Sequence, residues 1–509
     1  MLLSLAFLTP VLLSFSGCAS DRDVTLRVYN WEEYIDEGGK GSYDYDFAEE
    51  GEVADTRPIL DKFEQWYKDT YHKSVRVEYS TFGTNEDLYN QLKLGDKYDL
   101  VCPSEYMIMK LAAEGMIQPL DERFFDETIE NNYYINNVSP FIREKFDEGK
   151  MTVKDQEEPQ SWSKYAAGYM WGVTGLVYNP AQVGKTALQE SGWSIMLDSA
   201  YKNKVTTKDN VRDSYFVGLG ILYREDLLKL KEQNENGELS DEDYTKQVTA
   251  IMNDVKPETV EKVTKILKDM KSNIFGFETD TGKSDMVKGT ISMNFAWSGD
   301  AVYALDEADK QNVELNFYIP EECANLFFDG WVMPKDEKRN KDTEQAALAF
   351  INFMSRPDNA VRNSYYIGYT SVIAGNDNPD DEFSDYMLEY IKETYDEGKG
   401  EDYDLSYFFG EGAVIKTKEE HRQLYAQYPP SDTVKRCAVM NYYGDEEEAI
   451  NELWTQIKGE QLSAWAIVVI CVAVVAIVLF VVFSKFGHKI EFRLKPKKGY
   501  KLVKQEKLK

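Results

Sequence analysis

The first clear hydrophobic pattern in the chain is a strand that ends in aromatic and acidic residues. Residues 26–35 read Leu-Arg-Val-Tyr-Asn-Trp-Glu-Glu-Tyr-Ile, and their apolar positions suit a buried β-strand that Asn30 interrupts. Trp31 and Tyr34 are then expected to project from the carboxyl end of this strand. Open α/β sheets bind their ligands at that edge.

An alternation of predicted helices and strands follows this strand. Pro58 stands at a favourable first-turn position of a helix, and residues 74–79 alternate as a second strand. Asn85 is expected to cap a second helix, and residues 98–102 form a third predicted strand. This β-α-β-α order predicts a parallel sheet.

Polar and aromatic side chains gather at one edge of the predicted sheet. Ser104 and Tyr106 directly follow the third strand, so we expect them at the same edge as Trp31. Glu32 and Glu33 accompany the aromatic pair of the first strand. A protonated amine at such a surface gains attraction to the ring faces and a carboxylate partner. Taken alone, the decapeptide also fits a core strand that enters a helix.

The N-terminal segment indicates export. Residues 2–15 are apolar with one proline, and the Ser16-Gly17-Cys18 that follows resembles the lipobox of bacterial lipoproteins. We therefore interpret residues 1–20 as a signal or lipobox segment, with Cys18 as the lipidation site. An ordinary secretory signal is the alternative, since the apolar run is too short to span a bilayer.

The C-terminal segment predicts a membrane anchor. Residues 462–483 form a run of 22 residues without a charge, about the length that a helix needs to cross the hydrocarbon. Residues 484–509 hold ten Lys or Arg against two Glu, and this basic tail predicts the cytoplasmic side. We therefore expect a protein of the cell membrane, with its binding domain on the extracellular side.

Composition and motif content argue against several function classes. The formal net charge is −31, and the chain before the basic tail carries −39, so nucleic acid is not an expected partner. Five cysteines and three histidines lack metal-ligand spacing, and we find no catalytic or nucleotide-binding motif. We predict no catalytic residue, no cofactor, no metal and no enzyme activity. Residues 232–243 match a calcium loop only in part, so a helical hairpin over 224–255 is preferred.

Several longer motifs occur in order along residues 24–458. They are Val28-Tyr-Asn-Trp-Glu-Glu-Tyr34, Tyr98-Asp-Leu-Val-Cys-Pro-Ser104, Glu114-Gly-Met-Ile-Gln-Pro-Leu-Asp121, Tyr169-Met-Trp-Gly172, Trp297-Ser-Gly-Asp300, Phe327-Phe-Asp329 and Ile367-Gly-Tyr369. Together they resemble the polyamine-binding subunits of spermidine/putrescine ABC importers, which are bacterial extracellular solute-binding proteins.

The resemblance implies an α/β fold of the type II periplasmic-binding class. Two lobes, each a mixed and mostly parallel sheet flanked by helices, would enclose the ligand between them, and the chain would cross twice. On that scheme residues 24–164 and 330–458 form lobe 1, and residues 165–329 form lobe 2. The C-terminal transmembrane helix would be an addition to this fold.

The resemblance also implies the ligand-binding residues. The expected aromatic walls and hydroxyl partners are Trp31, Tyr34, Ser104, Tyr106, Trp297, Phe327 and Tyr369, and the expected carboxylates are Glu33, Asp213, Asp300 and Asp329. A polyamine needs this combination, because its methylene chain lies on aromatic walls and its ammonium ends pair with carboxylates. For each residue alone, a structural role is the alternative.

Two positions depart from the spermidine-preferring pattern of the family. Phe327 stands where those proteins have Trp, and Asn210 stands where they have Asp. Loss of one carboxylate removes a partner for one ammonium, which argues for a diamine as ligand.

We therefore predict an extracellular polyamine-binding subunit, for putrescine or spermidine, that delivers its ligand to an ABC permease and its ATPase. The expected membrane attachments are the C-terminal helix and an N-terminal lipid. One alternative is a protein of the same fold for another solute, such as an amino acid, a quaternary amine or ferric iron. The other alternative is a surface receptor without a transport role.

Overall fold

The computed structural model describes residues 24–46, 54–376, 378, 381, 383–418 and 422–459. The predicted lipidation site Cys18, the predicted membrane helix 462–483 and the basic tail 484–509 lie outside these residues. Within the described ranges, no helix has the length and apolar character that a membrane crossing requires.

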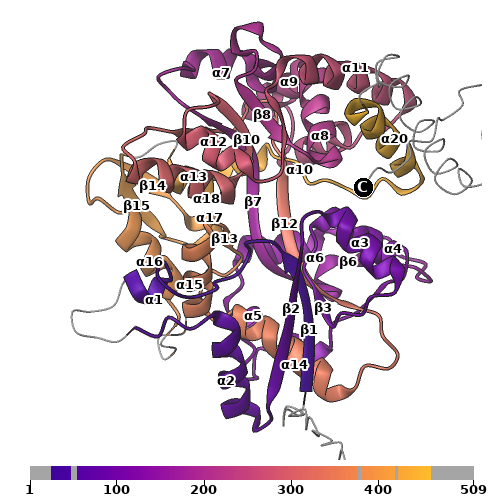
Figure 1. Ribbon diagram of the computed structural model, residues 1–509, viewed down its shortest axis with the longest axis vertical. Coiled ribbons are helices and arrows are strands. Elements are labelled where there is room, and N and C mark those ends of the chain that lie inside the picture. The colour runs from indigo at the N-terminus through magenta and orange to yellow at the C-terminus, as the bar shows by residue number, and fades with distance from the viewer. Residues whose placement is uncertain are drawn as a thin grey trace, which may run out of the picture. The chain divides into compact units, whose positions relative to one another are not determined.

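The main feature of the described part is a mixed 11-stranded sheet with the order β2-β1-β3-β12-β7-β10-β8-β9, to which β4, β11 and β13 add at the sides (Figure 1). Its strands are β1 (Val24–Trp31), β2 (Val75–Phe82), β3 (Leu100–Val101), β4 (Ile117–Gln118), β7 (Ala166–Tyr178), β8 (Val205–Lys208), β9 (Gly276–Glu278), β10 (Met293–Trp297), β11 (Asn316–Tyr318), β12 (Leu326–Pro334) and β13 (Thr370–Ser371). Two small hairpins pair β5 (Lys150–Met151) with β6 (Gln160–Ser161), and β14 (Glu401–Asp404) with β15 (Val414–Thr417).

The first three strands confirm the predicted parallel arrangement. Strand β1 lies between β2 and β3 and pairs with both in parallel. The predicted cap of helix α3 was wrong by one residue: Thr84 is the N-cap, and its side chain accepts from the Asp87 N–H. Asn85 lies inside the helix, and its amide instead donates to Ser104 Oγ at 3.1 Å and to Tyr106 Oη at 3.0 Å. Its side chain therefore supports the sheet edge.

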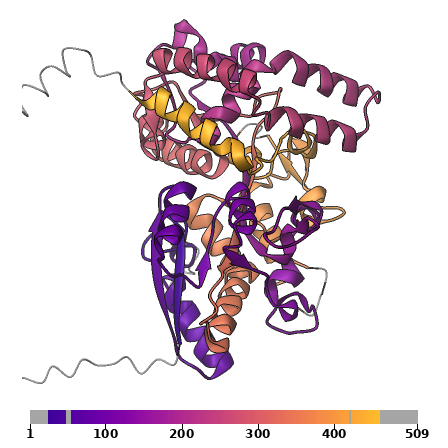
Figure 2. The same cartoon turned by 90° about the vertical axis from the view of Figure 1, so that its right-hand side faces the viewer.

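Two long strands connect the lobes. Strands β7 and β12 pair antiparallel from Leu326 opposite Val173 to Val332 opposite Ala166, with a bulge after Asp329. At one end β12 pairs with β3, and at the other end β7 pairs with β10 and β11. Both strands run between the two groups of helices in Figure 1, and Figure 2 shows these two groups of helices from the side. Every residue of both strands is buried, and apart from Thr174 and Asp329 their residues are apolar, aromatic or glycine.

Helices cover the sheet in both lobes. Those around lobe 1 are α2 (Ile59–Tyr71), α3 (Asn85–Leu94), α4 (Glu105–Ala113), α5 (Tyr133–Asn137), α6 (Pro140–Glu148) and α14 (Lys341–Met354). Those around lobe 2 are α7 (Lys185–Ser191), α8 (Val211–Leu222), α9 (Arg224–Glu235), α10 (Asp241–Met252), α11 (Pro257–Asn273), α12 (Thr281–Val287) and α13 (Ser298–Lys310). Helices α9 and α10 form the predicted hairpin, and Ser240 caps the second of them.

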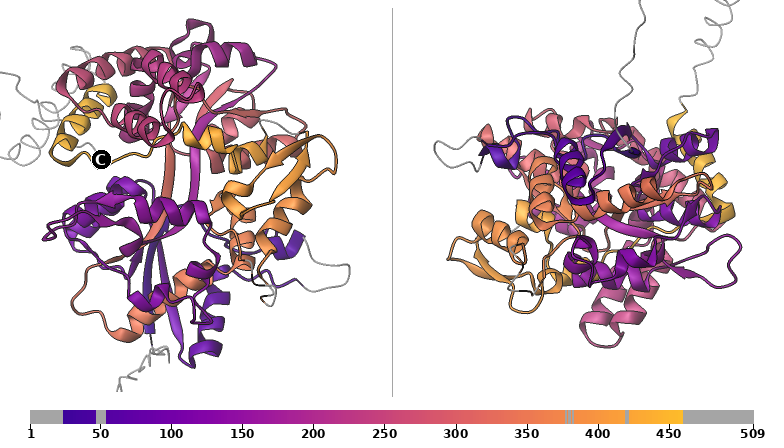
Figure 3. Two further views of the ribbon diagram at one scale, coloured as in Figure 1. Left: turned by 180° about the vertical axis from the view of Figure 1, so that it is seen from behind. Right: turned by 90° about the horizontal axis from the view of Figure 1, so that it is seen from below.

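The remaining described helices precede α2 or follow α14 in the chain. They are α1 (Tyr43–Asp46), α15 (Pro357–Ile367), α16 (Tyr386–Tyr395), α17 (Ser406–Phe409), α18 (Gln423–Gln427), α19 (Ser431–Lys435) and α20 (Glu447–Lys458). Helix α17 packs on α6, whereas α18 packs on α13 and β11 (Figure 3). Strand β13 pairs with β7 near its middle, which brings the segment after α15 to the junction between the lobes.

Candidate ligand-binding site

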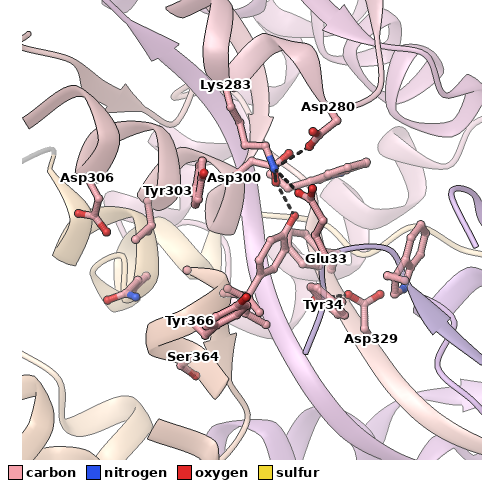
Figure 4. A pocket seen from close by; sticks show the side chains of 18 of the residues that line it. Glu33, Tyr34, Asp280, Lys283, Asp300, Tyr303, Asp306, Asp329, Ser364 and Tyr366 are labelled. Atoms are coloured by element: carbon pink, nitrogen blue, oxygen red, sulfur yellow. Dashed lines mark hydrogen bonds and ion pairs between the residues drawn. The ribbon is translucent and has the colours of Figure 1, made fainter. Parts of the chain in front are cut away.

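A cavity of about 1070 Å³ lies where elements of both lobes meet. All of the predicted ligand-binding residues line it, although they come from distant parts of the sequence. They are Trp31, Glu33, Tyr34, Ser104, Tyr106, Asp213, Trp297, Asp300, Phe327, Asp329 and Tyr369. Figure 4 shows several of these side chains converging on the cavity. The structure therefore brings the predicted set together.

Asp329 is a buried carboxylate that has no positive partner among the described residues. It lies on β12, and its two oxygens accept from the Tyr34 hydroxyl and from Ser104 Oγ, each at 2.7 Å. No lysine or arginine of the described residues forms an ion pair with it. Burial raises the pKa of Asp329 to about 6, and the two hydrogen bonds offset this only in part. A cation that entered the cavity would supply the missing charge partner.

Asp213 is a second buried carboxylate without an ion pair among the described residues. It lies in the first turn of α8, which Asn210 caps by accepting from the N–H groups of Arg212 at 2.7 Å and Asp213 at 3.2 Å. Burial raises the pKa of Asp213 to about 7, although the positive charge of Lys208 opposes this. Asn210, at the position predicted to have lost a carboxylate, thus serves as a helix cap.

Asp300 differs from these two carboxylates because the chain neutralises it. Lys208 Nζ lies 2.8 Å from one oxygen, while Lys283 Nζ at 3.6 Å and the Tyr369 hydroxyl at 3.1 Å contact the other. Burial opposes ionisation of Asp300, but the two ammonium groups outweigh it and lower its pKa. A Cβ at Gly299 would lie 2.1 Å from the Tyr369 ring. Only glycine at this position lets Tyr369 reach Asp300.

Aromatic rings form the apolar walls of the cavity. The rings of Tyr34 and Tyr369 meet edge to face at 4.7 Å, and Phe327 lies 6.4 Å from Tyr369. Trp31 packs on Phe82 at 4.6 Å. Such rings offer both contact area and negative ring faces to an alkyl ammonium ion.

Two of the predicted walls already contact cations of the chain. Lys208 Nζ lies 4.6 Å above the Trp297 ring, and the Arg212 guanidinium lies 4.3 Å above the Tyr106 ring. Arg212 also stacks on Tyr443 at 3.7 Å. The protein therefore uses part of its own aromatic surface for internal charges.

Several charged residues of the cavity were missed by the sequence analysis. Arg212, Asp280, Lys283 and Glu105 line the cavity, and Lys208 lies behind Asp300. Burial raises the pKa of Glu105 to about 8, and its carboxylate accepts from the Phe328 N–H at 3.0 Å. The only available signal was that Arg212 and Glu105 adjoin predicted site residues. The lysines and Asp280 resemble ordinary surface residues in the sequence.

Comparisons with known proteins agree with this fold. A spermidine/putrescine-binding periplasmic protein of Salmonella typhimurium is 25% identical over 354 residues, which cover 69% of this chain and 78% of that protein. The putrescine-binding periplasmic protein PotF of Escherichia coli is 26% identical over 368 residues, covering 70% and 80%. The crystal structure of a spermidine/putrescine ABC transporter substrate-binding protein, PotD from Streptococcus pneumoniae, has a TM-score of 0.52 and 25% identity. It covers 85% of this chain and 98% of PotD.

The fold is thus the two-lobed type II periplasmic-binding fold expected from the sequence. Residues 59–388 match the family of bacterial extracellular solute-binding proteins. The chain belongs to that family.

Proposed function

We propose that the protein is the polyamine-binding subunit of an ABC importer and that it takes a diamine in the cavity between its lobes. The observation that carries this proposal is the pair Asp213 and Asp329. Both are buried and lack an ion pair among the described residues, and both line one cavity with aromatic walls. Two ammonium groups would replace protons or water as the partners of these carboxylates.

The rest of the ligand would lie against the aromatic rings. The methylene chain of a diamine is apolar, so it gains burial against Trp31, Tyr34, Phe327 and Tyr369. An amino acid or an anion would instead bring a carboxylate close to Asp213 and Asp329, at a Coulombic cost. Ferric iron would need several hard oxygen ligands in one place, and tryptophan walls contribute none.

Closure of the lobes belongs to this proposal. Asp213 lies on α8 of lobe 2, whereas Tyr34 and Ser104, which orient Asp329, belong to lobe 1. A ligand that contacts residues of both lobes binds the closed form more tightly than the open form. It therefore shifts the equilibrium toward the closed form. The cavity of about 1070 Å³ exceeds what a small diamine fills, which also favours closure on binding. The closed form would deliver its ligand to the permease and its ATPase.

The attachment to the membrane is likewise proposed. We infer that residues 1–20 direct export, that Cys18 carries lipid, and that 462–483 spans the membrane ahead of a cytoplasmic tail over 484–509. The division into lobe 1 (24–164 and 330–458) and lobe 2 (165–329) remains part of the same proposal. The site would perform capture and release, without a chemical step.

Thermal unfolding of the purified protein with a ligand panel tests the function. Putrescine and spermidine should raise the unfolding midpoint, since a ligand at 100 times its Kd stabilises the folded state by about 2.7 kcal/mol. Glutamate, choline and ferric citrate should leave the midpoint unchanged. A shift with one of these three and none with the polyamines would favour another solute. Loss of putrescine uptake on deletion of the gene would separate a transport subunit from a surface receptor.

A further inference from the structure

Lys283 places its own ammonium group inside the cavity. From helix α12 its Nζ lies 2.6 Å from Asp280 Oδ1, 3.4 Å from Glu33 Oε2 and 3.6 Å from Asp300 Oδ1 (Figure 4). It also lies 5.1 Å from the centroid of the Tyr303 ring. Three carboxylates and an aromatic ring are the surroundings that an amine-binding pocket provides for a ligand ammonium.

The Lys283 ammonium is held firmly in this position. The side chain is only 13% exposed, and the nearby carboxylates outweigh its burial and raise its pKa. Asp280 and Asp300 belong to lobe 2, whereas Glu33 follows β1 of lobe 1. The Glu33 carboxylate is 73% exposed, so its bond to Lys283 is screened and contributes little. The main partners of Lys283 are therefore Asp280 and Asp300.

The cavity thus has two differently occupied regions. Around Asp300 the chain supplies two ammonium groups, from Lys208 and Lys283. Around Asp213 and Asp329 it supplies no ion pair among the described residues. A ligand cation therefore finds free carboxylates in the second region and a repelling ammonium in the first.

We propose that Lys283 is a specificity-determining residue: its ammonium is a tethered substitute for one ammonium of a longer polyamine and makes the site prefer diamines. The inference rests on the proposed function. A diamine uses Asp213 and Asp329 and leaves Lys283 in place. The third ammonium of a triamine would have to displace Lys283 from Asp280 and Asp300 or lie beside it, and both are unfavourable.

A purely structural role for Lys283 predicts a different outcome. The contact between Asp280 and Lys283 spans three residues at the start of α12, and such a pair could serve only to stabilise that helix. Replacing Lys283 would then lower the unfolding midpoint but leave the ratio of affinities for two polyamines unchanged. The ratio is therefore the informative quantity.

The test is a calorimetric titration of the full chain with putrescine and with spermidine. Three variants are compared with the wild type: Lys283→Gln, Lys283→Arg, which keeps the charge, and Lys288→Gln, a control at the exposed end of the same helix. Lys283→Gln should raise the ratio of spermidine affinity to putrescine affinity at least tenfold. Lys283→Arg and Lys288→Gln should stay within threefold of the wild type. If Lys283→Gln does not fold, Lys283→Met carries the same expectation.

The outcomes separate the two proposals. A ratio in Lys283→Gln within twofold of the wild-type ratio, with polyamine binding intact, would overturn the role of Lys283 alone. A folded wild type that binds neither polyamine would overturn the proposed function, and the specificity role with it.

Discussion

The Tyr34 hydroxyl donates to Asp329 at 2.7 Å, across 295 residues of sequence. Ser104 Oγ donates to the other oxygen of the same carboxylate at 2.7 Å. Both donors are neutral, so they fix the direction of the carboxylate without cancelling its charge. This arrangement suits a group whose cation arrives from outside the chain.

Replacing Tyr34 by Phe tests whether this hydrogen bond supports binding. The variant keeps the ring but leaves one oxygen of a buried carboxylate without its donor, which typically costs about 1–3 kcal/mol. Putrescine affinity should fall by roughly 5- to 150-fold. Tyr67→Phe is the control, because the Tyr67 hydroxyl is buried without a hydrogen-bond partner among the described residues and lies outside the cavity. Equal affinities of the two variants would argue against the role of Tyr34.

Polyamine binding should depend on pH. In the ligand-free protein, burial raises the pKa of Asp213 to about 7 and of Asp329 to about 6. Because an ammonium pairs with the ionised carboxylates, putrescine affinity should rise from about pH 5 to about pH 8, and binding near about pH 6.5 should release protons. Calorimetry in buffers of different ionisation enthalpy measures that release. An affinity that is constant over this range would contradict the assignment.

Without ligand, the folding stability should change with pH in the opposite direction to the putrescine affinity: the contribution of these two carboxyl groups falls as the pH rises. The folded protein holds these protons more tightly than the unfolded chain does, so the stabilisation is complete below about pH 4. It is lost as the pH rises through about 6 to 7. The midpoint shift caused by putrescine should accordingly be larger at about pH 8 than at about pH 5.5.

Asn210→Asp should shift the preference toward spermidine. Either side chain caps α8 through its Oδ1, so the helix should survive the change. The substitution adds a carboxylate to the lining of the cavity, where a third ammonium gains a partner. Competition between putrescine and spermidine on wild type and variant measures the shift. A wild type that prefers spermidine, with the same preference in Asn210→Asp, would contradict the selectivity argument.

The first strands could be predicted from the sequence, because each depends on a local pattern, whereas distant site residues such as Trp297, Phe327 and Tyr369 were expected only from the resemblance to the family. Apolar alternation in β1 and β2 fixes which side chains are buried. The cap of α3 could not be assigned in this way, since Thr84 and Asn85 are both good caps. In the structure the Asn85 side chain donates to Ser104 and Tyr106, and Thr84 is the cap. Because these contacts form only when the chain folds, the sequence does not reveal them.

The charge state of Asp300 could not be predicted for a similar reason. Its partners Lys208 and Lys283 come from the end of β8 and from α12, and no spacing rule connects them. A lysine in a polar stretch is usually solvated, so its sequence context carries no sign of an internal ion pair. The distinction between a free carboxylate at Asp329 and a neutralised one at Asp300 therefore comes from distances alone.

Protease treatment of intact cells tests the predicted attachment. With lipid at Cys18 and a membrane helix over 462–483, protease should release most of the chain and leave a small C-terminal fragment in the membrane. An antibody against the basic tail over 484–509 detects that fragment. Protection of the whole chain would contradict an extracellular binding domain.

The most direct test of the polyamine site is calorimetric titration of the full chain with putrescine at about pH 8, above the pKa of both carboxylates. The wild type should bind one putrescine per chain. Asp329→Asn should bind at least about 30-fold more weakly, because loss of one partner from a buried charge pair typically costs about 2–5 kcal/mol. Asp269→Asn, at an exposed site on α11 outside the cavity, should bind like the wild type. Absence of saturable binding by the wild type, or equal binding by Asp329→Asn and Asp269→Asn, would contradict the account.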